Sequence, residues 1–304
     1  MDKVHPYLVE QFTSRGYLCD IIVQISYNEF IELKDEYEIL IIRSKFNVDK
    51  NAISSKNNLK CIIRIGAGVE HIDTVFAKSK GIRVISTPEG NAPAVAEHCL
   101  GMLLSTLKKI ATSDREVRNG AWLREKNKGT ELSSQTVGII GFGNTGKAFA
   151  KLLSAFGCKI LVYDKFKTRF TETYIKEVSL DELLHQSTAL SLHINYLPEN
   201  YYFINMDLLQ KAKQKPIFIN TSRGLNVNTA DLILALDEDV ISFVCLDVLE
   251  YENVDLQIPP KTAWNDTLFR LTANKHVLLT PHTAGQTLDA ELRHAHIAVE
   301  KYFV

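Results

Sequence analysis

Short apolar runs alternate with amphipathic segments along nearly the whole chain. The runs have the length of buried strands, and the segments between them repeat their apolar residues at helical spacing. Strands that alternate with helices predict βαβ units and a mostly parallel sheet. The runs that we interpret as strands cover residues 21–25, 39–43, 61–65, 82–86, 137–141, 159–163, 189–194, 216–220, 243–247 and 277–280. The sequence therefore predicts an α/β protein.

A long predicted helix divides this alternation into two regions. Asn91 can cap it, Pro93 lies in its first turn, and apolar residues recur through Ile110. We interpret it as the connection between two doubly wound parallel-sheet domains. The other predicted helices cover residues 6–15, 147–156, 180–185, 206–212, 230–236 and 286–303, with helix or loop at 49–56 and 69–80. Residues 115–132 are polar and are expected along the surface, and residues 251–274 are expected to form an irregular insertion.

The most informative motif lies at residues 136–148, where an apolar run leads into three glycines at the spacing G-x-G-x-x-G. Gly141 permits a tight turn, Gly143 allows a pyrophosphate to approach the backbone, and Gly146 lets the next helix pack close to the strand. The N-terminus of that helix favours an anion. The alternative is a glycine turn without a ligand. Because Asp164 ends the next predicted strand, where a carboxylate can bind a ribose 2′-hydroxyl, the sequence predicts a dinucleotide site.

The composition narrows the classes of function. The chain has 304 residues, of which 45% are hydrophobic, and a formal net charge of −1, which argues against nucleic acid or a membrane surface as partner. It shows no apolar run of membrane-spanning length and no basic-then-apolar leader. The five cysteines are far apart, without a C-x-x-C pair, so we expect reduced thiols and no metal site. These features predict a cytoplasmic protein.

Three side chains that could carry chemistry follow predicted strands in the second region: Arg223, Glu252 and His282. The carboxyl ends of these strands share the edge where the glycine turn lies. A histidine exchanges protons near neutral pH, a carboxylate stabilises its charged form, and an arginine binds a carboxylate by two hydrogen bonds. With a nicotinamide, these groups suit the interconversion of 2-hydroxy and 2-keto acids. Taken singly, Arg223 could cap a helix, Glu252 could be solvated, and His282 could bind a backbone carbonyl.

In the order of its motifs, the chain resembles the D-isomer-specific 2-hydroxyacid dehydrogenase family over nearly its whole length. The motifs are Gly66-Ala67-Gly68-Val69-Glu70-His71-Ile72-Asp73, Asn91 with Val95-Ala96-Glu97, the glycine turn, Thr221-Ser222-Arg223-Gly224, Asp247-Val248 with Glu252, and Thr280-Pro281-His282. The resemblance implies NAD, a small-molecule substrate, an active site in a cleft and a homodimer. It also implies a Rossmann-type NAD-binding domain, residues 91–283, inserted into a flavodoxin-like substrate-binding domain, residues 1–90 and 284–304.

The resemblance also implies a role for individual residues. The implied catalytic residues are Arg223, Glu252 and His282. The implied cofactor-binding residues are Gly141, Gly143, Asn144, Thr145, Gly146, Asp164, His193, Thr221 and Asp247. The implied substrate-binding residues are Arg43, Arg64, Gly66, Ala67, Gly68, Val69 and Arg124. For His193 a structural role is the alternative, and His185, His294 and His296 are interpreted as residues on helix surfaces.

Arg43, Arg64 and Arg124 make the chain most similar to the phosphoglycerate dehydrogenase branch of this family. Arginines that converge on a cleft suit a phosphate dianion. Arg64 lies in an apolar run, where burying a charged side chain costs free energy unless the charge has a partner. We therefore expect the oxidation of 3-phosphoglycerate to 3-phosphohydroxypyruvate, as in serine biosynthesis, or its reverse. Because the chain stops soon after its last predicted helix, we expect no C-terminal regulatory domain. The alternatives are a glyoxylate or hydroxypyruvate reductase and an NAD-sensing binding protein of the corepressor type.

Overall fold

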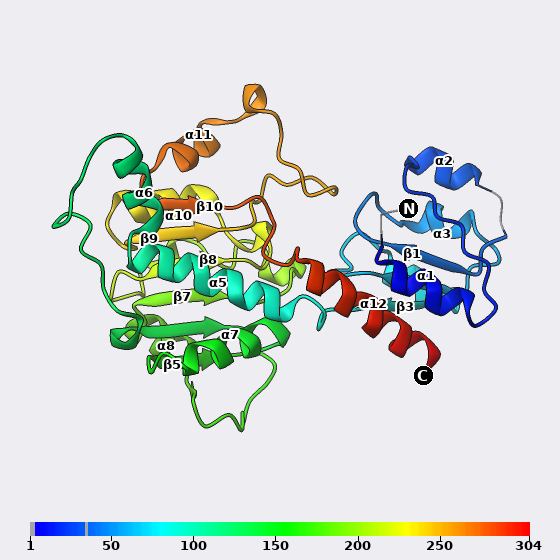
Figure 1. Ribbon diagram of the computed structural model, residues 1–304, viewed down its shortest axis with the longest axis horizontal. Coiled ribbons are helices and arrows are strands. Elements are labelled where there is room, and N and C mark those ends of the chain that lie inside the picture. The colour runs from blue at the N-terminus through cyan, green and yellow to red at the C-terminus, as the bar shows by residue number, and fades with distance from the viewer. Residues whose placement is uncertain (1–3, 34–35) are drawn as a thin grey trace. The chain divides into compact units, whose positions relative to one another are not determined.

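The computed structural model describes residues 4–33 and 36–304 of the chain. The chain forms two compact units. The first unit comprises Met1–Ala92, Glu252–Ile258 and Gln286–Val304, and the second comprises Pro93–Tyr251 and Pro259–Gly285. Both units consist of parallel strands and helices, so the predicted α/β class is confirmed (Figure 1).

The second unit is built on a seven-stranded sheet in which all neighbouring strands are parallel. Its strand order, β10-β9-β8-β7-β4-β5-β6, runs outward from β4 in both directions, which is the doubly wound order. The strands are β4 (Thr136–Ile140), β5 (Lys159–Tyr163), β6 (Lys176–Glu177), β7 (Ala189–Leu192), β8 (Ile217–Asn220), β9 (Phe243–Leu246) and β10 (Val277–Leu279). Their carboxyl ends therefore share one edge of the sheet.

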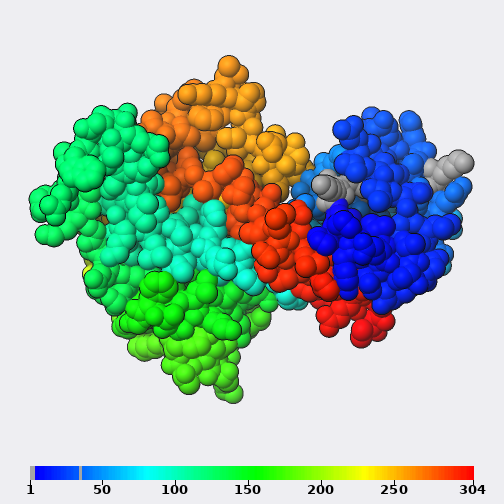
Figure 2. Space-filling model, viewed as in Figure 1, coloured from blue at the N-terminus to red at the C-terminus, as the bar shows by residue number. Residues whose placement is uncertain are grey.

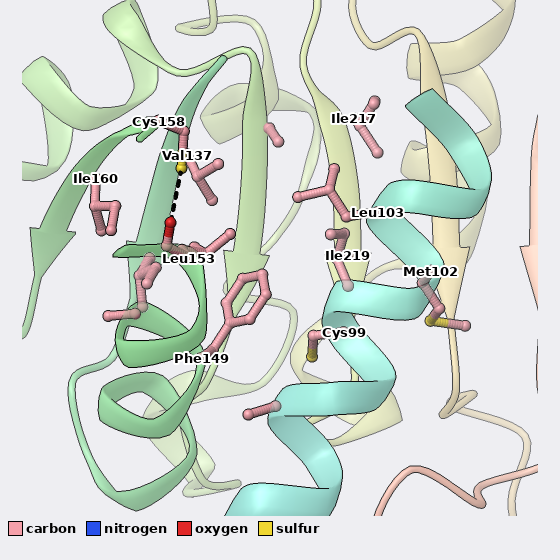
Figure 3. Close-up of a cluster of buried hydrophobic side chains, with 14 of the residues drawn as sticks. Cys99, Met102, Leu103, Val137, Phe149, Leu153, Cys158, Ile160, Ile217 and Ile219 are labelled. Carbon is pink, nitrogen blue, oxygen red and sulfur yellow. Dashed lines mark hydrogen bonds between the residues drawn. The ribbon is translucent and has the colours of Figure 1, made fainter. Parts of the chain in front are cut away.

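Helices cover both faces of this sheet. On one face, α5 (Ala92–Leu107) and α7 (Asn144–Ser154) share a buried cluster with the strands, in which Leu103, Val137 and Phe149 belong together (Figure 3). The other face packs against α8 (Leu180–Gln186), α9 (Met206–Leu209), α10 (Thr229–Asp237) and α11 (Asp266–Ala273). The unit also contains α6 (Ile110–Arg118) and the 3-10 turns η1 (Leu132–Ser134), η2 (Pro198–Asn200), η3 (Gly224–Asn226) and η4 (Lys261–Ala263). Burial on both faces explains why its central strands are continuous apolar runs.

The first unit has a parallel sheet of the order β1-β2-β3 in its described residues. The strands are β1 (Ile39–Ile42), β2 (Cys61–Arg64) and β3 (Arg83–Ser86). Cys61 and Ile63 point to one face, which α1 (Pro6–Thr13) and α12 (Leu288–Phe303) cover, and Ile62 points to the other. That second face is covered by α2 (Tyr27–Glu32), α3 (Lys50–Ser54) and α4 (Thr74–Ser79).

Several expectations for local structure were wrong. Residues 21–25 form no strand, because none of the described residues pairs with them, and α2 follows instead. The long helix ends at Leu107 rather than at Ile110, since Lys109 adopts a left-handed φ of 53°. A separate helix, α6, follows and has no buried residue, which agrees with the surface position expected for the polar stretch that begins at residue 115. The insertion at 251–274 contains α11. Periodicity does not report which segments find a hydrogen-bonding partner, so such errors arise at the margins of the sheets.

The cysteines, the hydropathy of the helices and the clusters of metal-binding side chains bear on the remaining expectations. All five cysteines are free, with Cys19 exposed and the other four buried. In the described ranges, no helix combines the length and the hydropathy that a membrane crossing requires. Within the same ranges, no cluster of three or more His, Cys, Asp and Glu side chains could hold a metal ion.

Candidate active site

The glycine turn after β4 is shaped by close backbone contacts. Gly141 has a φ of +93°, and a Cβ there would lie 2.6 Å from the carbonyl oxygen of His193. A Cβ at Gly146 would lie 2.2 Å from the carbonyl oxygen of Gly141, so α7 begins directly against the turn. Any larger residue at either position would push the backbone apart, and both positions therefore require glycine.

Gly143 differs from these two glycines because its surroundings are open. A Cβ at Gly143 would have no neighbouring atom within 4 Å. Gly143 is also the N-cap residue of α7, and no side chain caps this helix of 11 residues. The first amides of α7, which include those of Asn144 and Thr145, therefore lie at an open position at the positive end of the helix dipole. The pyrophosphate of a dinucleotide fits this cradle.

Asp164 lies beside the same turn. Its carboxylate accepts a hydrogen bond of 2.8 Å from the amide of Phe142, which is inside the glycine motif, and bonds of 2.9 Å from the amides of Phe166 and Lys167. These bonds hold a negative charge at the end of β5, next to the cradle. Such a carboxylate can accept a hydrogen bond from a ribose hydroxyl and repels a 2′-phosphate, which favours NAD over NADP.

The side chain of His193 forms hydrogen bonds with protein groups beside the glycine turn and does not face a ligand. Its Nδ1 lies 3.1 Å from the Thr145 hydroxyl and its Nε2 lies 2.8 Å from the Ser191 hydroxyl, so both ring nitrogens have protein partners. Burial lowers the pKa of His193 to about 3, and the ring is neutral at physiological pH. The Thr145 hydroxyl, inside the glycine motif, thus joins the turn to this ring. The geometry thus favours the structural alternative for His193.

Arg223 is held in a tight loop after β8. The buried side chain of Asn220 donates to the Arg223 carbonyl at 3.0 Å and accepts from the Ser222 amide at 3.0 Å. The next residue, Gly224, approaches the loop after β9 so closely that a Cβ would lie 2.0 Å from the carbonyl carbon of Leu249. The loops after these two neighbouring strands therefore pack together.

His282 is positioned by Asp247, which follows β9. The His282 amide donates to the Asp247 carbonyl at 2.8 Å, and the Asp247 carboxylate accepts from the amides of Thr283 and Ala284 at 2.9 Å each. The Thr280 hydroxyl donates to the same carboxylate at 2.5 Å. Asp247 thus anchors the residues on both sides of His282. The other predicted cofactor residue of this region, Thr221, is buried and lies 3.1 Å from the Cys99 sulfur through its hydroxyl.

One contact in this network was not predicted. His98, on α5, places its Nε2 2.9 Å from the Thr280 hydroxyl and 3.6 Å from the Asp247 carboxylate. The sequence marked His98 only as a position on a long helix, and no motif signalled it. Its contact spans 182 residues of chain, which pattern analysis does not reach.

Glu252 belongs to the segment Glu252–Ile258 of the first unit. In the same unit, Arg64 ends β2 and Gly66 lies in the loop that follows it. Gly66 has a φ of +144°, and its missing side chain leaves room for the Arg64 guanidinium, one nitrogen of which would lie 1.2 Å from a Cβ. The Gly66 amide donates to the Thr87 hydroxyl at 2.9 Å. The prediction that backbone amides of this loop bind a substrate carboxylate therefore narrows to those of residues 67–69.

His294 is buried, and its interpretation as a helix-surface residue was wrong. Its Nδ1 lies 2.7 Å from the Thr87 hydroxyl. Burial, together with the charges of Arg64, Arg43 and Arg293, lowers the pKa of His294 to about 4. The positive charges of three arginines thus disfavour protonation of one buried imidazole ring. Arg293, which donates to the Gly90 carbonyl at 2.9 Å, was missed because nothing in its amphipathic helix distinguishes it from a solvated residue.

The second unit places Arg124 away from the carboxyl edge of its sheet. Arg124 is exposed in the arm of residues 108–131, which follows the C-terminus of α5 and leads back to the amino end of β4 (Figure 1). The Thr130 amide donates to the Leu107 carbonyl at 3.0 Å and closes the base of the arm there. Arg223 and His282 follow the carboxyl ends of the strands. The structure therefore does not bring Arg124 together with them within the second unit.

Comparisons with known proteins agree with this geometry. A family model for the D-isomer specific 2-hydroxyacid dehydrogenase NAD binding domain matches residues 100–284. A hydroxypyruvate reductase of Thermotoga maritima is 35% identical over 280 residues, which are 91% of this chain and 87% of that protein. A D-3-phosphoglycerate dehydrogenase of Archaeoglobus fulgidus is 33% identical over 96% of this chain, which spans 54% of that protein's length.

The fold is likewise similar to that of solved structures. The D-lactate dehydrogenase of Aquifex aeolicus, solved with NAD and lactic acid, has a TM-score of 0.83 at 27% identity and covers 98% of this chain, which covers 91% of that one. The glycine turn, the open cradle at Gly143 and Asp164 supply the features that a dinucleotide needs. The family match covers the strands that carry them. This chain belongs to the D-isomer-specific 2-hydroxyacid dehydrogenase family and is an NAD-dependent enzyme.

Proposed function

We propose that this enzyme interconverts 3-phosphoglycerate and 3-phosphohydroxypyruvate, as in serine biosynthesis. The observation that carries the proposal is the group of arginines in the first unit. Arg43 and Arg64 follow or end neighbouring parallel strands, and both act with Arg293 on the pKa of the same buried histidine, His294. Ligands of open parallel sheets bind beyond the carboxyl ends of the strands. A group of guanidinium ions at that edge suits a phosphate dianion better than a neutral substituent.

In this proposal the remaining residues act on the hydroxy acid. Arg223 binds the substrate carboxylate and polarises the developing carbonyl, with help from the amides of residues 67–69. The imidazole of His282 takes the hydroxyl proton during oxidation and returns it during reduction. Glu252 stabilises the protonated imidazole. NAD, when bound in the glycine turn, supplies the hydride acceptor.

Reduction of hydroxypyruvate or glyoxylate is the second candidate function, and a specific observation favours it. The hydroxypyruvate reductase of Thermotoga maritima is 35% identical to this chain over 280 residues, and a glyoxylate reductase of Thermofilum pendens is 34% identical over 293 residues. Within the second unit, Arg124 also lies in the arm at the amino end of β4, whereas Arg223 and His282 follow the carboxyl ends of their strands. An unphosphorylated substrate would need no arginine group.

Steady-state kinetics on a panel of acids separates the two candidates. The panel contains 3-phosphoglycerate, glycerate and lactate with NAD or NADP, and hydroxypyruvate and glyoxylate with the reduced cofactors. We expect the highest kcat/KM for 3-phosphoglycerate. In the variant Arg64→Met, loss of a charge-assisted contact worth roughly 1.5–3 kcal/mol should raise the KM for 3-phosphoglycerate about 10- to 100-fold. The control is Arg83→Met in the same unit, because Arg83 lies at the amino end of β3, away from the carboxyl edge that carries Arg64. Equal kcat/KM for glycerate and 3-phosphoglycerate would overturn the proposal.

We also propose a homodimer in the cytoplasm. The arm of residues 108–131 stands at the surface of the second unit (Figure 2) and exposes several large apolar side chains: Ile110, Val117, Trp122 and Leu123. Exposed apolar clusters of this kind mark protein contacts. In a dimer, the arm could carry Arg124 to the partner's substrate site. Light scattering of Trp122→Lys tests this, since a dimeric wild type and a monomeric variant are expected. The free thiols support a reducing compartment.

A further inference from the structure

Tyr202 lies between η2 and α9, in the connection that follows β7, and has a left-handed backbone with a φ of 50°. This conformation is unfavourable for a residue with a large side chain, so it persists only where the surroundings impose it. The Tyr202 amide donates to the Leu225 carbonyl at 3.0 Å, and the Tyr202 carbonyl accepts from the Asn205 side chain at 3.0 Å. Both backbone groups of Tyr202 are therefore held by neighbouring segments.

The side chain of Tyr202 reaches the segment after β9. Its hydroxyl donates to one oxygen of the Glu250 carboxylate. Burial, together with that carboxylate, raises the pKa of the Tyr202 phenol, so the phenol keeps its proton and remains a donor. The ring stacks on that of Tyr201, with the ring centroids 4.0 Å apart. Contacts of the tyrosine side chain thus offset the unfavourable backbone.

The Glu250 carboxylate also holds the start of α10. Its second oxygen accepts from the Thr229 amide, the first of α10, at 2.8 Å. The backbone of Glu250 lies against Gly224, where a Cβ would be 2.4 Å from the Glu250 nitrogen. Gly224 opens η3 and Thr229 opens α10. Glu250 therefore contacts both ends of the short segment that runs from η3 to α10.

Together these contacts form a closed chain around η3. Tyr202 binds Leu225, in the middle of η3, through its amide and binds Glu250 through its hydroxyl. Glu250 in turn touches Gly224, at the start of η3. The contacts join the connections that follow β7, β8 and β9, which are neighbouring strands of the sheet. A shift of any one of these connections therefore moves η3.

Arg223 is the residue directly before η3 and is the N-cap residue of that turn. One peptide bond joins it to Gly224, so the position of η3 sets the direction from which the Arg223 side chain starts. On the other side, the buried Asn220 side chain donates to the Arg223 carbonyl at 3.0 Å. Asn220 thus fixes Arg223 from the side of β8, and the contacts of Tyr202 and Glu250 fix it from the side of η3.

We propose that Tyr202 is a positioning residue, which acts through Glu250 and η3 to orient Arg223 toward the substrate carboxylate. This inference rests on the role proposed above for Arg223. A guanidinium binds a carboxylate by two parallel hydrogen bonds, which require a fixed orientation. A displacement of about 1 Å can lower catalysis about 100-fold. A role in folding alone would lower the amount of active enzyme, and hence the apparent kcat, without changing the KM.

The test compares the full chain with Tyr202→Phe, which keeps the ring and removes the hydroxyl. The KM for hydroxypyruvate with NADH, and for 3-phosphoglycerate with NAD, should rise about tenfold, since both substrates carry the carboxylate. The dissociation constant of NAD should change less than about twofold, because Tyr202 is not part of the glycine turn. The control Tyr174→Phe, at a 37% exposed tyrosine of the same unit, should keep the wild-type KM. An unchanged KM in Tyr202→Phe would refute the positioning role.

A double-mutant cycle shows whether Tyr202 acts through Glu250. Glu250→Ala should raise the KM about as much as Tyr202→Phe or more, and the double variant should be no worse than Glu250→Ala, because both changes remove the same hydrogen bond. Glu250→Gln keeps an acceptor for the Thr229 amide and can donate to the phenol oxygen, so its KM should stay within about threefold of the wild type.

Two results of the cycle would contradict action through this hydrogen bond. One is a double variant whose KM rises by the product of the two single effects. The other is a KM of Glu250→Gln as high as that of Tyr202→Phe, which also decides the question if Glu250→Ala does not fold.

Arg223→Lys separates this inference from the proposed function. Lysine keeps the positive charge but loses the bidentate geometry, so the KM should rise about tenfold or more if Arg223 binds the substrate carboxylate. An unchanged KM in Arg223→Lys would refute the proposed role of Arg223 and the inference with it. A raised KM in Arg223→Lys, together with a wild-type KM in Tyr202→Phe, would leave that role standing and refute only the positioning by Tyr202.

Discussion

The Thr280 hydroxyl donates a hydrogen bond of 2.5 Å to the carboxylate of Asp247, which is only 2% exposed. Together with the amides of Thr283 and Ala284, this donor fixes the loop that presents His282. His282 has a φ of 53°, a backbone conformation that costs a non-glycine residue about 1–2 kcal/mol. The buried carboxylate offsets that cost, because charge-assisted hydrogen bonds are the strong ones. Asp247 therefore acts on His282 through the loop.

Asp247→Asn should separate this positioning role from mere packing. The amide has nearly the same shape, but its nitrogen cannot accept a hydrogen bond, so at least one of the three donors loses its partner. We expect a loss of about 2 kcal/mol in the free energy of unfolding and a fall of roughly tenfold or more in kcat, measured by urea titration and steady-state kinetics. Thr280→Ser keeps the hydroxyl and should behave like the wild type. Full kcat in Asp247→Asn would contradict the positioning role.

His282→Asn tests proton transfer without changing the backbone, because asparagine adopts the left-handed conformation more readily than most residues. Turnover should fall about 10²- to 10⁴-fold, which is the usual contribution of a general acid or base. NAD binding, followed by fluorescence titration, should change less than about twofold. The control is His276→Asn, an exposed histidine just before β10, which should keep wild-type turnover. A similar loss in both variants would show that the effect is not specific to His282.

Gly143→Ala and Gly146→Ala form a matched pair in one motif. The new methyl group at Gly143 meets nothing in the protein, so the variant should fold normally while the methyl occupies the space expected for the pyrophosphate and weakens NAD binding at least tenfold. At Gly146 the methyl would lie 2.2 Å from a carbonyl oxygen, so the expected result is a loss of stability of about 1–3 kcal/mol. Thermal unfolding without and with NAD measures both effects. Unchanged NAD affinity in Gly143→Ala would contradict the cradle.

The stability of the first unit should depend on pH through His294. Its pKa is about 4 in the folded state and 6.5 without perturbation, so the unfolded state binds the proton more readily between these values. Stability is therefore fully present above pH 6.5 and decreases as the pH falls toward 4. Between pH 6.5 and pH 5 the loss should be about 1.5 kcal/mol. Hydrogen exchange of the β2 amides at the two pH values measures it, and His294→Gln should remove most of the difference. An equal pH dependence in the variant would assign it to other groups.

Much of the fold could be predicted from the sequence, because its signals are local. The run of apolar residues into Gly141, Gly143 and Gly146 specifies strand, turn and helix within thirteen consecutive positions of the printed sequence, residues 136–148. The predicted α/β class and the predicted NAD dependence are both confirmed. The predicted roles of Arg223, Glu252 and His282 remain predictions.

The sequence by itself determined the order of strands and helices, the glycine turn and the presence of an acid after the next strand, since each depends on neighbours along the chain. Only the tertiary structure decided which side chains meet. Thr87 and His294 are 207 positions apart, and their contact turns an expected surface histidine into a buried, neutral one. Likewise, the strand-like residues 21–25 pair with no strand among residues 4–33 and 36–304. Burial and hydrogen bonding depend on where a segment lies in the fold, and the local sequence pattern does not specify that position.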